Sequence, residues 1–510
     1  MALGGALSVG LVGLKAFIIQ LQAFISPGLP FFSIIGLPDA SLSEARERVK
    51  SACTASGVSW PATRVTVNMS PASMPKRGSS HDLAIAASVL SAAGVIGPRA
   101  LENTVVLGEL NLDGTVLPIN GLLPIMLHVK EQGIENVIVP RANRDEAELV
   151  DGLRVFCVSH LGELLEMLGA HATYEVHEVH ADSQKRDVPE ADLTLPGDMN
   201  EVVGQREAKE ALTIAAAGGH HVLMTGPPGM GKTMLASRFP GILAPLDHQE
   251  QFEVASIRSL CGQLGAYGIR DTPPFEAPHH TATVASLVGG GAGIGEPGAV
   301  TRAHCGVLFL DEAPEFSPRV LQSLREPLES GFVAVSRSKG VTIFPARFQL
   351  IMAANPCPCG YGFGTGERCT CREKDRIRYF SRLSGPILDR VDMQLSVNPV
   401  SHIGAAAPQE GESSEHIRNR VIAARTIAAQ RFASFGWACN AQASGSWLRE
   451  HTPAPVLAVV NKSLSTYQIS LRGAYRVMRL AWTICDLDGR GSPNLDDVDR
   501  ALSLRTQENA

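Results

Sequence analysis

The stretch HHVLMTGPPGMGKTMLA, residues 220–236, joins a short apolar run to a glycine-rich turn and the start of a helical pattern. Its spacing, Gly226-x4-Gly231-Lys232-Thr233, fits a loop that binds nucleotide phosphates between a strand and a helix. In such a loop the backbone N–H groups surround the phosphates, the lysine reaches the β- and γ-phosphates, and the hydroxyl ligates Mg²⁺. We therefore expect ATP and Mg²⁺ to be bound by Gly226, Pro227, Pro228, Gly229, Met230, Gly231, Lys232 and Thr233.

Two further apolar runs end in residues suited to ATP hydrolysis. GVLFLDE, residues 306–312, is typical of a buried strand that delivers Asp311 towards Mg²⁺ and Glu312 as the group polarising the attacking water. FQLIMAANP, residues 348–356, is a third such strand and ends in Asn355, which could orient the water or contact the γ-phosphate. Together the three motifs predict an ATPase.

Arginines later in the chain could act on the γ-phosphate. Arg390, in GPILDRVD, resembles an arginine finger supplied in trans to the ATP of a neighbouring subunit. In SLRGAYRVMR, Arg472 is the candidate for a second nucleotide sensor, with Arg476 as the alternative. Each could instead be an ordinary surface charge, but their order after the phosphate loop favours the functional interpretation. A finger acting in trans requires a ring, and we expect a homo-hexamer.

Four of the ten cysteines cluster at a spacing that suits a metal. Cys357-x-Cys359-x9-Cys369-x-Cys371 can supply four thiolates to a tetrahedral Zn²⁺, although C-x-C is tighter than the usual C-x2-C. Free thiols are the alternative. No histidine or carboxylate completes an open site, so we expect a structural rather than a catalytic metal.

Two basic segments are candidates for contact with nucleic acid. RCTCREKDRIRYFSR, residues 368–382, is either a solvated helix face or a knuckle touching nucleic acid or the adjacent subunit. FVAVSRSKGVTIFPARF, residues 332–348, reads as two strands joined by a polar turn with Arg337 and Lys339. Basic residues on such a tip would grip DNA phosphates without sequence preference. The alternative is a plain exposed hairpin turn.

The elements that must position these residues suggest a multidomain α/β protein. Short β-like runs alternate with helical stretches over residues 1–170, and a polar segment at 171–198 reads as a linker. A second α/β domain spans residues 199–400, and residues 401–510 are helical by their apolar spacing.

The composition of the 510-residue chain is that of an ordinary globular protein, with a net charge of −6 that gives no global reason for nucleic-acid binding. The first 36 residues carry one charge, Lys15, but no basic segment precedes the apolar run. KAFIIQLQAF, residues 15–24, alternates as a strand does, and polar and proline residues interrupt any membrane span. We expect a cytoplasmic protein without membrane contact.

The order of the long motifs resembles the ComM/YifB family of magnesium-chelatase-like AAA+ ATPases over nearly the whole chain. The motifs are AAAGGHHVLMTGPPGMGKTMLASRFPGIL, APHHT…LVGGG…PG…AHCGVLFLDE, FPARFQLIMAANPCPCG, SGPILDRVDM and GESSEHIRNRV. The resemblance implies a hexameric ring ATPase, and a characterised member drives branch migration of DNA during natural transformation. The sequence departs from the family pattern at Glu276, where Arg is usual, at Ala299, where Glu is usual, and at Cys305, where Asn is usual.

The N-terminal segment resembles the peptidase domain of Lon-type proteases. PKRGSS, residues 75–80, matches the loop of the serine nucleophile, and GELNLDGTVLPINGL matches the segment leading to its lysine base. Ser80 falls on the nucleophile, but Ile125 falls where the lysine should be, and neither Lys76 nor Lys130 occupies the matching place. Because a serine nucleophile needs a base, we expect a Lon-like fold without proteolysis, serving assembly or contact with DNA or a partner.

The sequence thus predicts a Lon-peptidase-like N-terminal domain, a P-loop AAA+ domain and a helical lid. Together they would form an ATP-driven ring motor on DNA, acting as a helicase on branched recombination intermediates. A magnesium-chelatase-type subunit and a protein-remodelling ATPase are the alternatives, and all three share the same ATPase core.

Overall fold

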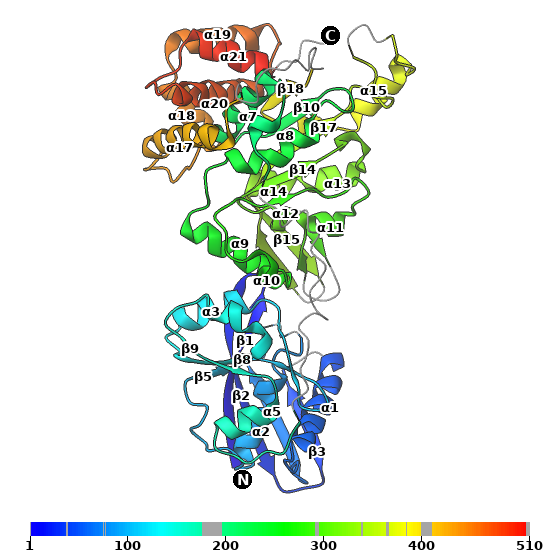
Figure 1. The fold of residues 1–510 in the computed structure, drawn as a ribbon, viewed down its shortest axis with the longest axis vertical. Helices are drawn as coiled ribbons and strands as arrows, with labels where there is room; N and C mark the ends of the chain where they lie inside the picture. The colour runs from blue at the N-terminus through cyan, green and yellow to red at the C-terminus, as the bar shows by residue number, and fades with distance from the viewer. Residues whose placement is uncertain are drawn as a thin grey trace.

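The computed structural model describes residues 2–36, 39–74, 76, 78–175, 196–290, 295–337, 340–363, 367–383, 385–398 and 411–505. The N-terminal α/β part and the second α/β part follow one another along the long axis of the molecule, and the helical C-terminal part lies beside the upper half of the second part (Figure 1). Much of the linker predicted at 171–198, the boundary near residue 400 and Lys339 lie outside the described residues.

A long antiparallel hairpin forms the centre of the N-terminal sheet. β1 (Ala2–Val12) and β2 (Lys15–Ser26) pair along their whole length, from Ala2 opposite Ile25 to Val12 opposite Lys15. The strand predicted at residues 15–24 is therefore confirmed. The near absence of charge in this segment has a simple cause, because Ile19, Leu21 and Ala23 are completely buried.

The N-terminal sheet has seven strands in the order β3-β4-β2-β1-β5-β8-β9. Its other strands are β3 (Phe31–Ile35), β4 (Arg64–Ser70), β5 (Thr104–Val106), β8 (Asn136–Pro140) and β9 (Arg154–Val158). The helices of this part are α1 (Asp39–Ala55), α2 (Asp82–Ala92), α3 (Leu122–Glu131), α4 (Arg144–Ala147) and α5 (Leu161–Met167).

The run NTVVLGEL, residues 103–110, is divided between β5 and the short β6 (Glu109–Leu110), which pairs with β7 (Val116–Leu117). The reason is Gly108, whose φ of +155° turns the chain. Its N–H donates to the Ser80 carbonyl at 2.9 Å, and its own carbonyl accepts from the Leu83 N–H at 3.1 Å. This segment therefore pairs with the serine loop instead of continuing the strand.

The second sheet is entirely parallel, with the strand order β11-β14-β17-β10-β18. Its strands are β10 (Val222–Thr225), β11 (Phe275–Glu276), β14 (Val307–Leu310), β17 (Gln349–Ala354) and β18 (Met393–Ser396). The strands predicted before the phosphate loop, before Asp311 and before Asn355 are thus β10, β14 and β17. Because the strands are parallel, all their carboxyl ends lie at one edge and all their amino ends at the other.

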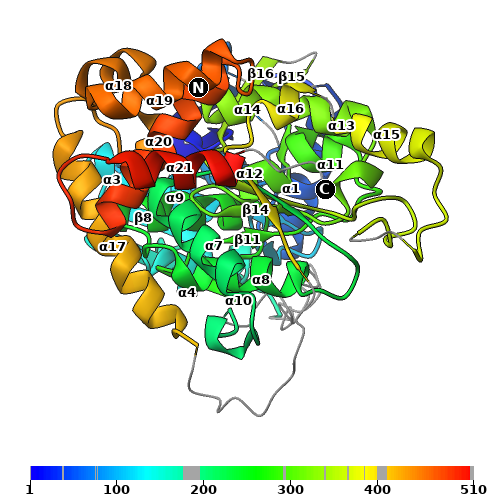
Figure 2. The ribbon, with the colours of Figure 1, turned by 90° about the horizontal axis from the view of Figure 1, so that it is seen from above.

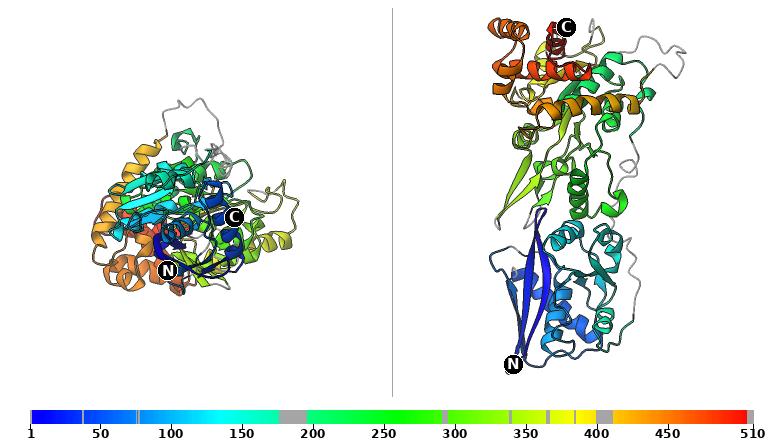
Figure 3. Two further views of the ribbon diagram at one scale, coloured as in Figure 1. Left: turned by 90° about the horizontal axis from the view of Figure 1, so that it is seen from below. Right: turned by 90° about the vertical axis from the view of Figure 1, so that its left-hand side faces the viewer.

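Helices and short insertions surround this sheet. They are α7 (Arg206–Gly218), α8 (Lys232–Arg238), α9 (His248–Leu260), α10 (Leu264–Tyr267), α11 (Val284–Val288), β12 (Gly289–Gly290), β13 (Glu296–Pro297), α12 (Ala299–Arg302), α13 (Pro318–Ser323), α14 (Arg325–Ser330), α15 (Glu373–Ser381) and α16 (Gly385–Leu388). The predicted hairpin is confirmed as β15 (Phe332–Arg337) and β16 (Gly340–Pro345), and it extends towards the N-terminal part (Figure 3, right).

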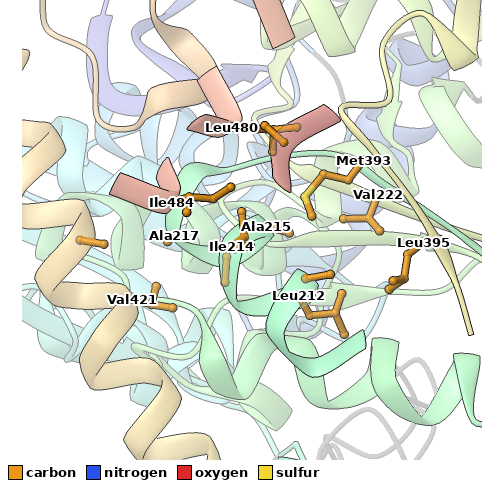
Figure 4. Close-up of a cluster of buried hydrophobic side chains, with 14 of the residues drawn as sticks. Leu212, Ile214, Ala215, Ala217, Val222, Met393, Leu395, Val421, Leu480 and Ile484 are labelled. Atoms are coloured by element: carbon orange, nitrogen blue, oxygen red, sulfur yellow. The ribbon is translucent and has the colours of Figure 1, made fainter. Parts of the chain in front are cut away.

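The C-terminal part consists of α17 (Ser414–Arg431), α18 (Gly445–His451), α19 (Ala454–Ser465), α20 (Leu471–Leu487) and α21 (Leu495–Arg505). Two of these helices, α17 and α20, bear out the helical pattern of the sequence. They pack on α7 and on the β10–β18 side of the sheet, where Val421, Leu480 and Ile484 join one apolar cluster with Val222 and Met393 (Figure 4). From above, these helices lie on the side of the molecule away from α15 (Figure 2).

The N-terminal part packs against α9 of the second part. The Gly121 N–H donates to the Ser259 carbonyl at 3.0 Å, and the Leu123 N–H donates to the Ser259 hydroxyl at 3.3 Å. The Ser259 hydroxyl in turn donates to Glu146, whose pKa is raised by burial. Among the described helices, none is both long and apolar enough to cross a membrane.

The packing of the C-terminal helices makes a stability prediction. Phe432 is fully buried against Trp437 and Trp447, whereas Phe435 is 50% exposed. Phe432→Ala should lower the free energy of unfolding of this part by about 3–5 kcal/mol through lost burial and a cavity. Urea unfolding followed by tryptophan fluorescence measures it, since three of the four tryptophans lie there. The control Phe435→Ala should lose less than ~1 kcal/mol; equal losses in both variants would contradict the packing described.

Candidate active site

The phosphate loop follows β10 at the carboxyl edge of the sheet and leads into α8. The Lys232 ammonium donates to the carbonyls of Gly226 at 2.6 Å and Pro227 at 2.9 Å. Its pKa is lowered mainly by burial, while Asp311 and Glu312 act in the opposite direction. Gly229 and Gly231 have φ values of +78° and +86°. These are left-handed conformations that favour glycine, so the spacing of the motif matches the backbone that the loop adopts.

The two neighbouring strands bring their end residues to this loop. Asp311 Oδ2 accepts a hydrogen bond from the Thr233 hydroxyl at 2.7 Å. Asn355 Oδ1 accepts one from the Lys232 ammonium at 3.1 Å. The five motif residues singled out on β10–α8, β14 and β17 therefore meet at one edge of the sheet, with Glu312 directly after Asp311.

Glu312 has its own partner. It adopts a left-handed backbone conformation, φ +50°, and His280 Nδ1 lies 3.4 Å from its Oε2. Both side chains are partly exposed, so the carboxylate is open to solvent. His280 comes from the loop between β11 and α11, and its ring packs at a tilt against that of His279, whose Nδ1 is 2.8 Å from the Thr281 hydroxyl.

The polar groups of this site suit a nucleoside triphosphate with Mg²⁺. Lys232 and the loop N–H groups can hold phosphate oxygens, and Thr233 with Asp311 offers hard oxygen ligands to Mg²⁺. Glu312 can accept a proton from water, and Asn355 can hold that water or a phosphate oxygen.

The arginines lie at the opposite edge of the same sheet. Arg390 precedes β18, and the Asp392 N–H in the same loop donates to the His221 carbonyl just before β10, at 3.0 Å. The Arg390 guanidinium is ion-paired with Glu329 of α14, and its side chain is only 9% exposed. Since four residues of β10 span about 13 Å, Arg390 is separated by the strand length from the phosphate loop of its own chain.

The second-sensor candidates share this edge. Arg476 is ion-paired with the buried Asp392 and donates to the Arg390 carbonyl at 2.8 Å. Arg472 is 3.7 Å from Asp389, and its side chain is 68% exposed. The pKa of Asp392 is held low despite burial by His220, whose Nδ1 lies 3.7 Å from its Oδ2, and by the charge of Arg476. Asp392 thus fixes the loop of Arg390 to the helix of Arg476.

The four cysteines of the cluster come together after β17. All four Sγ atoms lie within 4.8 Å of one another, and Cys357 is completely buried. The basic side chains that follow on α15 are exposed to solvent, in keeping with either interpretation of that segment. Arg337 ends β15, with its backbone opposite Gly340, and Lys339 lies outside the described residues.

Two departures from the family pattern have a local structural account. Glu276 forms an ion pair with Arg302 at 3.0 Å, so its negative charge is compensated by a residue of α12. Cys305 adopts φ +57°, a left-handed conformation in which Asn is more favourable than Cys. Ala299 is buried at the start of α12.

The serine loop faces a cleft between the N-terminal part and the second part. Ser80 and Ile125 line the same cleft, together with Glu296 and Phe344 of the second part. The alignment that places Ile125 near the serine is therefore spatially consistent. The Lys76 ammonium donates to the Pro71 carbonyl, and it is 3.5 Å from the Met74 carbonyl.

A parallel sheet with a phosphate loop, an Asp–Glu pair and an Asn at its carboxyl edge is the arrangement of a P-loop domain of the AAA+ type. Comparison with known protein families shows which AAA+ family the sequence matches. The family described as magnesium chelatase, subunit ChlI, matches residues 198–404, a second pattern for this subunit matches residues 21–143, and its C-terminal pattern matches residues 411–505.

Whole-chain relatives identify the family. An uncharacterized protein of Mycobacterium tuberculosis is 46% identical over 508 residues, 99% of both chains. The competence protein ComM of Haemophilus influenzae is 36% identical over 512 residues, 99% of this chain and 98% of that protein. The uncharacterized protein YifB of Escherichia coli is 37% identical over 497 residues, 97% of this chain and 95% of YifB. The chain belongs to the ComM/YifB family of magnesium-chelatase-like AAA+ proteins, a family that implies ATPase activity.

The likeness to Lon is partial. The Lon protease of Lachnoclostridium phytofermentans is 33% identical over 107 residues, which cover 20% of this chain and 13% of the protease.

Three residues of the site were missed by sequence reasoning. His280 stands in APHHT, a stretch quoted only as a family motif, and Asp392 is two residues after Arg390 in its own motif. Both could have been found by asking which charges must partner Glu312 and the arginines. Glu329 has no local signal, because only the fold brings α14 to Arg390.

The geometry of the site predicts that one substitution, at Glu312, blocks ATP hydrolysis without blocking ATP binding. Glu312→Gln removes the proton acceptor and leaves Lys232, Thr233 and Asp311 in place, so ATP turnover should fall at least ~100-fold while ATP still binds. Steady-state phosphate release and equilibrium ATP binding measure the two effects. Glu415→Gln, on an exposed position of α17, is the control and should keep wild-type turnover. Turnover near wild type in Glu312→Gln would contradict the role given to this carboxylate.

Proposed function

We propose that the protein is a homo-hexameric ring ATPase of the cytoplasm that moves along DNA and drives branch migration of recombination intermediates. The observation that carries the proposal is the division of the site between two edges of one sheet. Lys232, Asp311, Glu312 and Asn355 lie at the carboxyl edge, whereas Arg390 lies beyond the amino edge. A closed ring that apposes these edges would complete each site with the neighbour's arginine.

Within a ring, the proposed roles divide as follows. Lys232 and the loop N–H groups bind the phosphates, Thr233 and Asp311 hold Mg²⁺, and Glu312 accepts the proton of the attacking water. Arg390 of the adjacent copy neutralises charge on the γ-phosphate, and Arg472 or Arg476 reports the nucleotide state to the C-terminal helices.

Support for DNA as the substrate comes from three directions. The hairpin β15–β16 extends away from the sheet, and its turn carries Arg337 and Lys339 in the sequence. The exposed basic run of α15 offers a second contact with phosphates. A whole-chain relative is named a competence protein.

We also propose that the Lon-like domain is not a peptidase. Ile125 shares the cleft of Ser80 but has no proton acceptor, and the Lys76 ammonium is engaged by main-chain carbonyls. Its packing against α9 and its cleft with the second part suit a role in assembly or in guiding DNA.

DNA dependence of the ATPase tests the substrate. Turnover should rise at least ~5-fold with DNA, most with three- or four-way junctions, and the stimulation should weaken as salt is raised, because phosphate contacts release counterions. Lys232→Ala is the control and should abolish turnover with and without DNA. Unchanged turnover on every DNA would contradict the motor and favour a protein-remodelling ATPase, which stimulation by unfolded protein would then identify.

Mixing two inactive variants tests the shared site. Lys232→Ala keeps Arg390, and Arg390→Ala keeps an intact phosphate loop, so a random ring of both contains complete sites at about one interface in four. An equal mixture should therefore recover about a quarter of wild-type turnover, whereas each variant alone stays near background. An inactive mixture that forms rings of normal size would contradict an arginine supplied in trans.

A further inference from the structure

The four-cysteine cluster lies directly beside the nucleotide site. We propose that Cys357, Cys359, Cys369 and Cys371 bind one structural Zn²⁺, and that this metal holds the phosphate loop and Asn355 in the geometry that hydrolysis needs. The second half of this inference rests on the proposed ATPase activity.

The arrangement of the sulfur atoms fits a tetrahedral metal. Zn–S bonds of ~2.3 Å give S···S edges of ~3.8 Å in a regular tetrahedron. Cys357 Sγ lies 3.3 Å from Cys359 Sγ and 3.7 Å from Cys369 Sγ, and Cys359 Sγ lies 3.7 Å from Cys369 Sγ. These separations are far longer than the ~2.05 Å of a disulfide. Four sulfur ligands and no open position define a closed, structural site.

A backbone donor beside the cluster suits charged sulfur. The Gly362 N–H donates to Cys357 Sγ at 3.1 Å. Donors directed at ligand atoms stabilise thiolates and fix their direction, as the outer partners of metal sites do.

Two contacts connect the cluster with the phosphate loop and with Asn355. Cys357 follows Asn355 by two residues, so the cluster anchors the chain just beyond the end of β17. Gly360 packs on the phosphate loop, where a Cβ on Gly360 would lie 2.6 Å from Pro228 Cγ. The cluster therefore supports the loop from its outer side.

The helix that follows the cluster makes two more contacts with the site. Tyr379 of α15 is buried beside Asn355, whose backbone opposes the rise in the pKa of Tyr379 that burial causes. Arg382, just after α15, is ion-paired with Glu315 at 2.9 Å, and its guanidinium is 3.4 Å from the Pro314 carbonyl. Pro314 and Glu315 belong to the turn directly after Glu312.

These contacts explain how a bound metal would fix the segment between β17 and α15 against the nucleotide site. The described residues between β17 and α15 form neither helix nor strand, so few main-chain hydrogen bonds hold this segment. A Zn²⁺ that joins its two C-x-C ends would fix Gly360 against Pro228 and α15 against Asn355. Without the metal, four close sulfurs repel one another when ionised, and the support behind the site loosens.

Metal content and turnover of the full-length chain test the two halves of the proposal. Wild type purified in reducing buffer should contain about one zinc per chain by elemental analysis, and added Co²⁺ should give the absorption of a tetrahedral thiolate site. Cys369→Ser should lose most of the zinc and lower ATP turnover at least ~10-fold, with ATP affinity within ~3-fold of wild type. Cys157→Ser, on β9 of the N-terminal part, is the control and should keep both.

A second variant disturbs the contact and spares the sulfurs. Gly360 has φ +81°, and Gly360→Ala adds a methyl group against Pro228. It should keep the zinc and lower turnover ~10-fold by shifting the loop. Gly489→Ala is the matched control. Gly489 has a similar φ of +69°, but the added methyl group meets open space. Circular dichroism and melting curves check that each variant is folded.

The possible results distinguish three claims: the metal site, its coupling to turnover, and the ATPase activity itself. Wild type without zinc, and with the cluster thiols open to a thiol reagent, would overturn the metal site. Zinc-free Cys369→Ser with wild-type turnover, or Gly360→Ala with the turnover of Gly489→Ala, would overturn the coupling. A zinc-loaded wild-type chain that never hydrolyses ATP would overturn the proposed ATPase and the coupling together, while its zinc content would uphold the metal site.

Discussion

Parallel pairing of the five strands in the second sheet is the constraint on which the rest of the structure depends. It places the phosphate loop, Asp311 and Asn355 at one edge, because each follows the carboxyl end of its strand. It also places Arg390 and Asp392 at the other edge, because both precede β18. A side chain at the amino edge is kept from its own nucleotide by the length of a strand. The proposed ring would join these two edges, because a second copy can bring its amino edge to the carboxyl edge of the first.

The same geometry explains why each edge has its own support. At the carboxyl edge, Gly360 between the cysteines packs on Pro228 of the phosphate loop, and the buried Tyr379 of α15 lies beside Asn355. At the amino edge, Asp392 connects the loop of Arg390 with α20 through Arg476. A change in the C-terminal helices can thus reach the arginine directly. The insertion between β11 and β14 begins at His280 beside Glu312, so it too has a short path to the site.

Much of the nucleotide site could be predicted from the sequence, because each motif is a strand followed by a fixed polar residue. Lys232, Thr233, Asp311 and Asn355 meet as expected once the three strands are parallel neighbours. Other features depend on contacts distant in sequence. The glycine-rich β1 shows little alternation and gains its place by pairing with β2. The pairing of Glu329 with Arg390 and the position of α20 at the amino edge come from packing that no local pattern encodes.

The most direct test of the shared site is a high-resolution structure of Glu312→Gln assembled with ATP and Mg²⁺. The account predicts a closed ring in which the Arg390 guanidinium has left Glu329 and lies within ~3 Å of a γ-phosphate oxygen bound to the neighbouring chain. A nucleotide-loaded assembly in which Arg390 stays on Glu329, away from every nucleotide, would contradict it.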